Sequence, residues 1–95
     1  MGNRILIVGT YDTKDDELTY ISGVIAGQGG VALTMDVSVL GNPTAPTDWS
    51  KHDVVAEAGT TIDAIIAAED ENTAMQAMAR GSAALAARLY HEGQF

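Results

Sequence analysis

Cysteine is absent from the 95 residues, which excludes disulfide bonds, thiolate zinc sites and cysteine nucleophiles. Basic residues are scarce as well, because 5 Lys and Arg stand against 13 Asp and Glu, giving a formal net charge of -8. A surface of that sign repels the phosphates of nucleic acids and of anionic membranes, so we expect neither as a partner. A single bound nucleotide is still compatible with the charge, because backbone N–H groups can hold a phosphate without a basic patch.

Long apolar runs and aromatic residues are also missing. The first apolar run, residues 5–8, is far shorter than a secretory or membrane-spanning segment, so we expect a soluble cytoplasmic protein. Hydrophobic residues make up 46% of the chain and aromatic residues only 5%, so the core must consist mainly of aliphatic and methionine side chains. A chain of this length has room for one small domain.

The first third of the chain has the pattern of a strand, a helix and a second strand. Residues 4–8 form an apolar, β-branched run, which is typical of a parallel strand covered on both faces. Apolar residues then recur at helical spacing over residues 18–28, with Thr13 and Asp16 as a capping pair ahead of them. Residues 31–37 form the second strand. Together these elements predict a right-handed, Rossmann-like βαβ unit.

The remaining two thirds of the chain are predicted to be helical after an irregular stretch over residues 38–49. Ser50 is the expected N-cap of a short helix, Thr61 caps another, and the last helix runs from about Asn72 to Glu92. This last helix has an apolar stripe flanked by alanines: Met75, Met78, Ser82, Leu85 and Leu89. Packing on the protein's own sheet is the favoured interpretation of that stripe, and a dimer seam is the alternative.

Two parallel strands are too few for a stable sheet. The fold class is therefore α/β with an incomplete parallel sheet, as part of a three-layer α/β/α domain. We expect residues 1–95 to be the N-terminal part of a single Rossmann-like nucleotide-binding domain that is cut before the next strand. A homo-oligomer, or the remainder of the same domain, is then needed to cover the free strand edge.

A candidate binding loop follows the first strand, because α/β sheets bind ligands beyond the carboxyl ends of their strands. Gly9 allows a close backbone turn, Thr10 and Thr13 offer hydroxyls, and Lys14 offers a positive charge. Asp12 is suited to bind a hydroxyl or a magnesium ion. The spacing matches neither of the familiar glycine-rich phosphate motifs. An Asx turn at Asp12 with a threonine cap, and no ligand, explains the loop equally well.

Two further positions are ambiguous. Asp36 ends the second strand where dinucleotide-binding folds place a ribose-binding acid. The favoured interpretation is instead a solvated carboxylate at the end of the strand, with a cap on the next turn as its further role. Gly81 in the long helix indicates close packing, while Arg80 beside it stays open as a phosphate ligand. The sequence contains no nucleophile–base pair, no catalytic carboxylate pair and no metal cluster, so whether the protein is an enzyme stays open.

Four ordered blocks carry a resemblance to a known family: ILIVGTYDTK (5–14), MDVSVLGNP (35–43), AGTT (58–61) and MARG (78–81). They resemble the uncharacterised bacterial, fungal and plant family that is typified by the tomato mosaic virus resistance protein. Its members are several hundred residues long, begin with paired Rossmann-like subdomains, and include a plant protein that binds ATP there. In that family a glycine-rich strand and loop follow directly after the segment equivalent to residues 85–95.

The resemblance implies that ATP or a related adenine nucleotide binds here, with Mg²⁺ as a possible companion. The residues that it places near the nucleotide are Gly9, Thr10, Asp12, Thr13, Lys14, Asp36, Gly41 and Arg80. The expected function is therefore a nucleotide-binding module of a larger protein. The alternative is an oligomerisation or protein-interaction module that has no ligand site of its own.

Overall fold

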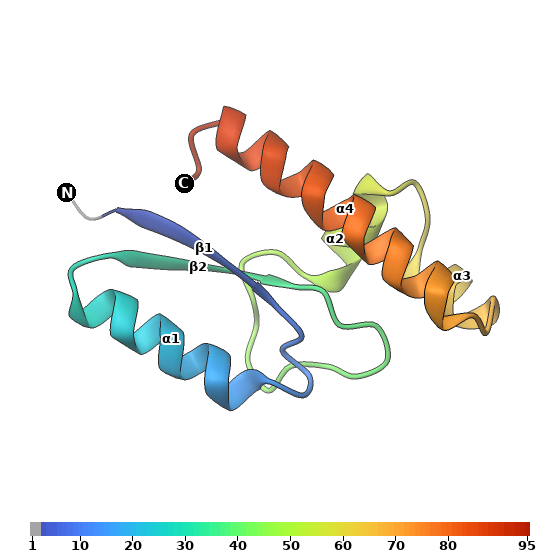
Figure 1. Cartoon of the computed structure of the whole chain (residues 1–95), viewed down its shortest axis with the longest axis horizontal. Helices are drawn as coiled ribbons and strands as arrows, with labels where there is room; N and C mark the ends of the chain where they lie inside the picture. The colour runs from blue at the N-terminus through green and yellow to red at the C-terminus, as the bar shows by residue number, and fades with distance from the viewer. Residues whose placement is uncertain (1–2) are drawn as a thin grey trace.

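A computed structural model describes residues 3–95, and these residues form two strands and four helices (Figure 1). In chain order the elements are β1 (Arg4–Gly9), α1 (Asp15–Gly27), β2 (Val31–Asp36), α2 (Lys51–Glu57), α3 (Ile62–Ala67) and α4 (Glu71–His91). The strands pair in parallel, with Arg4 opposite Val31 and Gly9 opposite Asp36. The α/β class and the βαβ unit followed by helices are confirmed.

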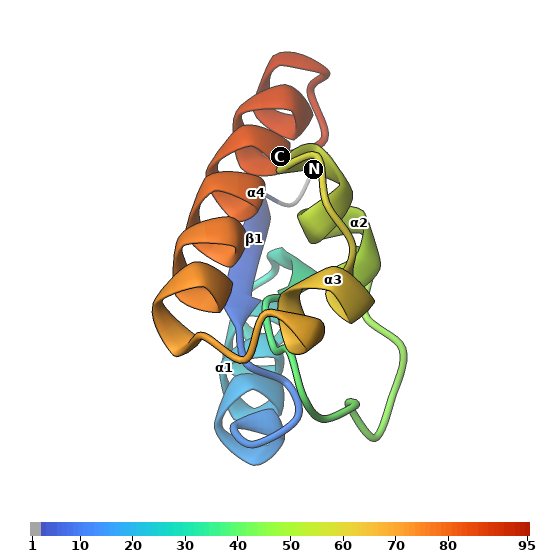
Figure 2. The ribbon, with the colours of Figure 1, turned by 90° about the vertical axis from the view of Figure 1, so that its right-hand side faces the viewer.

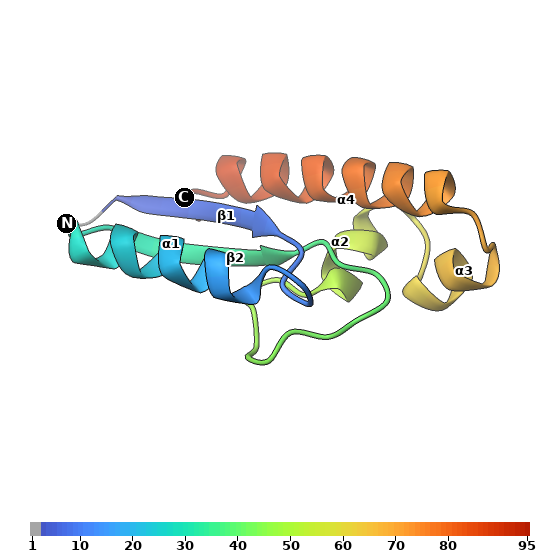
Figure 3. The same ribbon diagram turned by 60° about the horizontal axis from the view of Figure 1, so that its bottom comes forward.

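Helices cover both faces of this small sheet. Figures 2 and 3 show α1 on one face, with α2 and α4 on the other. Alternation along β1 explains the two cores, because successive strand side chains point to opposite faces. Ile7 packs in the cluster under α1, whereas Leu6 packs against the larger cluster under α2 and α4. Met35 of β2 lies at the centre of that larger cluster and is fully buried.

The outer edge of β2 is covered by a segment that was expected to be irregular. The backbone N–H of Trp49 donates to the carbonyl of Thr34, and its carbonyl accepts from the N–H of Asp36, both at 2.9 Å. The Asp48 carboxylate accepts the N–H of Thr34 at 2.7 Å. These bonds satisfy the strand's polar groups on that side, so the backbone of β2 is paired along both of its edges there.

Two of the predicted helix caps are confirmed, one helix starts slightly earlier than predicted, and one predicted cap is wrong. Ser50 forms a capping box with Asp53, and Thr61 accepts the N–H of Ala64, as expected. Asp70 caps α4, which begins one residue earlier than predicted. The predicted capping pair of Thr13 and Asp16 is wrong, because α1 begins one residue later, after Lys14, with no side-chain cap bond.

Helix α4 packs closely on α2 through a glycine. A Cβ atom on Gly81 would lie 2.2 Å from the Val54 carbonyl oxygen, so only glycine fits at this crossing. Met78, Leu85 and Leu89 of the predicted stripe are buried beside it. Met75, in contrast, is 63% exposed. The stripe is therefore mainly core, and the close-packing interpretation of Gly81 is confirmed. Among residues 3–95, no helix is long and apolar enough to span a bilayer.

Candidate functional site

The loops that follow the two strands meet at one end of the sheet, because parallel strands place their carboxyl ends together. The backbone N–H of Gly41 donates to Oδ2 of Asp12 at 3.2 Å. A Cβ on Gly41 would approach the Asp12 Cβ and Oδ2 to 2.8 Å, so the backbone can come this close only without a side chain. Two of the predicted site residues, far apart in the sequence, thus form one contact.

Asp36 holds the same two loops together from beneath. Its Oδ1 accepts the Ser38 hydroxyl at 2.6 Å, the Ser38 N–H at 3.0 Å and the Tyr11 N–H at 3.3 Å. The residue is only 1% exposed, so the interpretation as a solvated carboxylate is wrong, although its role in capping the following turn is confirmed. The structure therefore shows Asp36 as an organiser of the loops.

The loop after β1 forms a tight turn before α1. The carbonyl of Thr10 accepts the N–H groups of Thr13 at 3.2 Å and Lys14 at 2.9 Å, which leaves both threonine hydroxyls on the exposed side, 3.4 Å apart. Gly9 is needed just below, since a Cβ there would lie 2.6 Å from the side chain of Leu18. Lys14 is exposed at the start of α1.

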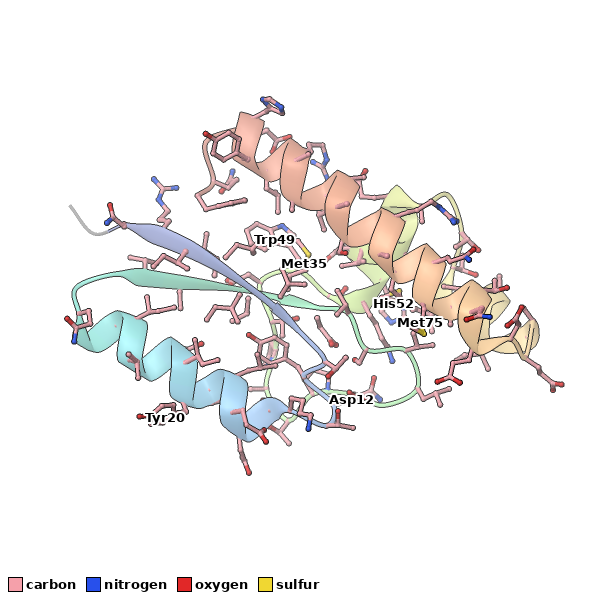
Figure 4. All side chains as sticks on the ribbon, in the orientation of Figure 1. Asp12, Tyr20, Met35, Trp49, His52 and Met75 are labelled. Atoms are coloured by element: carbon pink, nitrogen blue, oxygen red, sulfur yellow. The ribbon has the colours of Figure 1, made fainter. Side chains whose placement is uncertain are left out.

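A groove of about 720 Å³ lies between these loops and the N-terminal half of α4. Thr10, Asp12, Thr13 and Ser38 contribute its polar wall. The opposite wall is apolar and comes from α3 and α4, chiefly Ile65, Ile66, Met75 and Met78. Figure 4 labels Asp12 on the loop after β1 and Met75 near the start of α4.

The rim of the groove is acidic. Its described lining includes Asp12, Glu69, Asp70 and Glu71, and no lysine or arginine. The Thr73 hydroxyl and the Asn72 N–H both donate to Asp70 and hold the pKa of its carboxyl below the ordinary value. An anionic ligand that enters this groove must therefore bring a cation or reach one elsewhere.

The basic residues behave differently from what the sequence predicts. Lys51, which sequence reasoning did not single out, is buried, and its Nζ donates to the carbonyls of Val39 at 3.0 Å and Gly41 at 2.8 Å. It pins the loop after β2 to α2, and no sequence pattern marks that role. Arg80 is exposed on α4 and does not line the groove, so the structure does not bring it to the other predicted residues.

Tyr11 is the second residue whose position could not be read from the sequence. Its side chain is 4% exposed, and its hydroxyl finds no hydrogen-bond partner within residues 3–95. Burial raises the pKa of the Tyr11 phenol, and the carboxylates of Asp15, Asp36 and Asp48 raise it further. Folding thus favours the neutral phenol over the phenolate.

Across the described part of the chain, no group of three or more His, Asp or Glu side chains is placed to hold a metal ion. Asp12 lies in the groove with one oxygen bonded to Gly41. One carboxylate is sufficient for Mg²⁺ when the ion is brought by the phosphates of a nucleotide, because most of its other ligands are then waters and phosphate oxygens.

The parallel βαβ unit, with a groove at the carboxyl ends of its strands, is of the Rossmann-like α/β class. Within that class the chain belongs to the family UPF0261. Residues 3–95 match the N-terminal domain of this family, which is described as an uncharacterised protein family. The uncharacterised family expected from the four sequence blocks is confirmed at that level, while the link to the tomato mosaic virus resistance protein stays a prediction.

Relatives come from several bacteria. A UPF0261 protein of Brucella suis biovar 1 is 50% identical over 91 residues, which cover 96% of this chain and 22% of the relative. One of Clostridium tetani is 35% identical over 92 residues, covering 97% of this chain and 23% of the relative. The chain thus spans less than a quarter of the length of these relatives. No solved structure shows a significant match to it.

Proposed function

We propose that this chain is the N-terminal part of a module that binds ATP or a related adenine nucleotide. The observation that carries the proposal is the groove at the carboxyl ends of β1 and β2, with hydroxyls and a carboxylate on one wall and aliphatic and methionine side chains on the other. Such a combination suits a ligand with an apolar ring at one end and polar groups at the other. The resemblance to the family of the tomato mosaic virus resistance protein supports the same ligand.

In this proposal each wall of the groove contacts a different part of the nucleotide. Adenine lies against the apolar wall at Met75 and Met78, and the sugar and phosphates lie along the loop of Thr10 and Thr13. Lys14 stands at the exposed end of that loop, where it meets the terminal phosphate. Arg80 would act only after a change in its surroundings, since it lies outside the groove.

Magnesium is required in this proposal because of the acidic rim. Asp12, Glu69, Asp70 and Glu71 repel free triphosphate, and Mg²⁺ neutralises much of that charge. Asp12 is the carboxylate that would meet the ion, directly or through water. An ATP-dependent role would place the protein in the cytoplasm.

The test measures ATP binding by isothermal titration calorimetry, with and without Mg²⁺. It uses the long form of the protein, in which residues 1–95 are followed by further sequence up to the length of the family relatives. Asp12→Asn keeps an oxygen for the Gly41 N–H but removes the charge, so it should weaken Mg·ATP binding about tenfold, which corresponds to about 1.4 kcal/mol. Asp16→Asn is the matched control, because Asp16 is exposed on α1, lies outside the groove and carries the same charge.

Lys14→Ala should also weaken binding, and Arg80→Ala should have a smaller effect because Arg80 does not line the groove. Absence of measurable Mg·ATP binding in the long wild-type chain would refute the proposed function. Equal effects of Asp12→Asn and Asp16→Asn would remove Asp12 from the site and indicate only a general response to charge.

An interaction module is the second candidate, and the exposed side chains of α4 favour it. Met75 and Tyr90 are 63% and 64% exposed. Met78 and Leu85 belong to the core, so substitutions there would disturb the fold and do not test an interface. If α4 is an oligomer seam, Met75→Asp and Tyr90→Asp should dissociate the assembly in analytical ultracentrifugation while helix content is preserved. Unchanged sedimentation in both variants would argue against the seam.

A further inference from the structure

The outer edge of β1 is unpaired within residues 3–95. The N–H of Val31 donates to the Asn3 carbonyl at 2.7 Å, and the N–H of Val37 donates to the Gly9 carbonyl at 3.0 Å. Along a parallel strand, the backbone N–H and C=O groups of successive residues point to alternate edges. The backbone groups of the odd-numbered residues of β1 therefore point toward β2. The N–H and C=O groups of Leu6 and Val8 therefore face the other edge, where the described residues supply no strand.

The placement of the helices determines on which side a further strand must lie. Parallel crossovers are right-handed in nearly all proteins. The first crossover, through α1, leads from β1 to β2 on one face of the sheet. The second leaves β2 and returns along α4 on the opposite face (Figures 2 and 3). A right-handed crossover on the opposite face must step in the opposite direction, and so leads from β2 past β1 to the free side of β1.

The end of α4 brings the chain to the correct starting point. The Arg4 guanidinium donates to the carbonyls of Gly93 and Gln94 at 3.4 and 3.3 Å. This contact places the segment after α4 at the beginning of β1, and Figure 1 shows the C-terminus beside that strand. A strand that continues from there runs parallel to β1 from the same end of the sheet. The opposite edge of the sheet is already occupied by Asp48 and Trp49.

Apolar side chains near the free edge are uncovered on both faces. Ile5 and Val8, on opposite faces of β1, are 43% and 44% exposed. On α1, Ile21 and Val24 are 44% and 47% exposed, and Val24 lines a shallow groove together with Ile5. A strand on the free edge, with a helix after it, would remove these groups from water.

We propose that the outer edge of β1 is a docking surface for a parallel strand, supplied by the segment that follows position 95 in chains as long as the family relatives. The relatives are long enough, because this chain spans only 22% of the Brucella suis protein. The strand order is then β2, β1 and the new strand. In sheets of this order the crevice for ligands opens at the end of the first strand, where the crossovers diverge.

A consequence, which rests on the proposed function, is that the nucleotide site is formed jointly by residues 3–95 and by the segment that supplies the new strand. The loop after the new strand would lie beside Thr10–Lys14 and form another wall of the site. That wall is the natural source of the cation that the groove lining lacks. The 95-residue chain alone should then bind Mg·ATP more weakly than the long chain does.

The experiment measures amide hydrogen exchange, residue by residue, without nucleotide, in the chain continued to the length of its relatives. In this long chain, the backbone amides of Leu6 and Val8 should exchange at rates within about tenfold of those of Ile5 and Ile7. The inward-facing amides of Ile5 and Ile7 are the internal control, since β2 protects them in either case. In the 95-residue chain at low concentration, Leu6 and Val8 should exchange at least about 100-fold faster than Ile5 and Ile7, because their amides open locally to water.

Fast exchange at Leu6 and Val8 in the long chain, with Ile5 and Ile7 protected, would overturn the proposal. Protection that rises with protein concentration would overturn it too, because it would identify a second copy as the occupant. Mg·ATP is added only afterwards. If the edge amides are protected but ATP does not bind, the proposal of a docked strand stands and the proposal of nucleotide binding fails. Failure of one proposal is therefore distinguishable from failure of the other.

Discussion

The N–H of Gly41 donates to Oδ2 of Asp12, 3.2 Å away, and this bond joins the loops that follow the two strands. A Cβ at position 41 would come within 2.8 Å of that carboxylate and of the Asp12 Cβ. Lys51 holds the Gly41 carbonyl from the other side, so the backbone has little freedom to move away. The polar wall of the groove therefore depends on a residue that has no side chain.

Gly41→Ala should separate the two loops. The free energy of unfolding should fall by about 1–2 kcal/mol, because the new methyl group must displace the Asp12 side chain. Amide NMR shifts should change at Asp12 and its neighbours. Gly27→Ala is the control, since a Cβ there meets no atom within 4 Å, and at this helical position it should leave these shifts nearly unchanged and should not lower the stability. Unchanged Asp12 resonances in Gly41→Ala would contradict the close approach.

Gly81 and Gly23 form a matched pair of helical glycines with opposite expectations. Gly81→Ala should destabilise the fold by about 1–3 kcal/mol, because its Cβ would overlap the Val54 carbonyl and push α4 away from α2. Gly23→Ala on the exposed side of α1 should stabilise it by about 0.5–1 kcal/mol through helix propensity. Urea denaturation followed by circular dichroism measures both, and a stabilising Gly81→Ala would disprove the helix crossing.

Asp36→Ala should reduce the free energy of unfolding by about 2–4 kcal/mol, because the N–H groups of Tyr11 and Ser38 would lose their acceptor in a buried place. Asp36→Asn retains one oxygen and should cost less. Asp63→Ala, at an exposed position of α3, is the control for loss of a carboxylate and should change stability little. Thermal unfolding separates the three variants, and a wild-type melting temperature for Asp36→Ala would contradict the organising role.

Tyr11→Phe should raise the free energy of unfolding by up to about 1 kcal/mol, since it removes a buried hydroxyl that has no partner in the described residues. The pKa of the Tyr11 phenol is raised in the folded state by burial and by nearby carboxylates. Ionisation therefore begins in the unfolded chain at its ordinary pKa of about 10. Wild-type stability should fall as the pH rises through and above that value.

In the Tyr11→Phe variant, the free energy of unfolding should fall less steeply at alkaline pH, because the ionisation of Tyr11 no longer contributes. Denaturation at several pH values from neutral to alkaline measures this difference. Tyr20→Phe is the control, because the Tyr20 ring is 73% exposed and its removal should alter stability little. An identical alkaline decline in wild type and Tyr11→Phe would show that Tyr11 ionises with equal ease in both states.

Local signals in the sequence were sufficient for most of the elements. Ser50 with Asp53 and Thr61 are caps whose partners lie within three residues, so neighbouring residues alone determine them. Thr13 and Asp16 show the same spacing without forming the cap. The carbonyl of Thr10 takes the N–H groups of Thr13 and Lys14 instead, and the turn ends one residue later.

The sequence by itself determined the βαβ order, the helices and the stretches that follow each strand, because periodicity, caps and glycines act over a few residues. Only the tertiary structure decided that Asp36 is buried, that Lys51 supports Gly41, and that Met75 faces the groove while Arg80 does not. Those properties depend on contacts between segments 10 to 30 residues apart. The partners in such contacts are chosen by packing around the whole sheet, which no local pattern records.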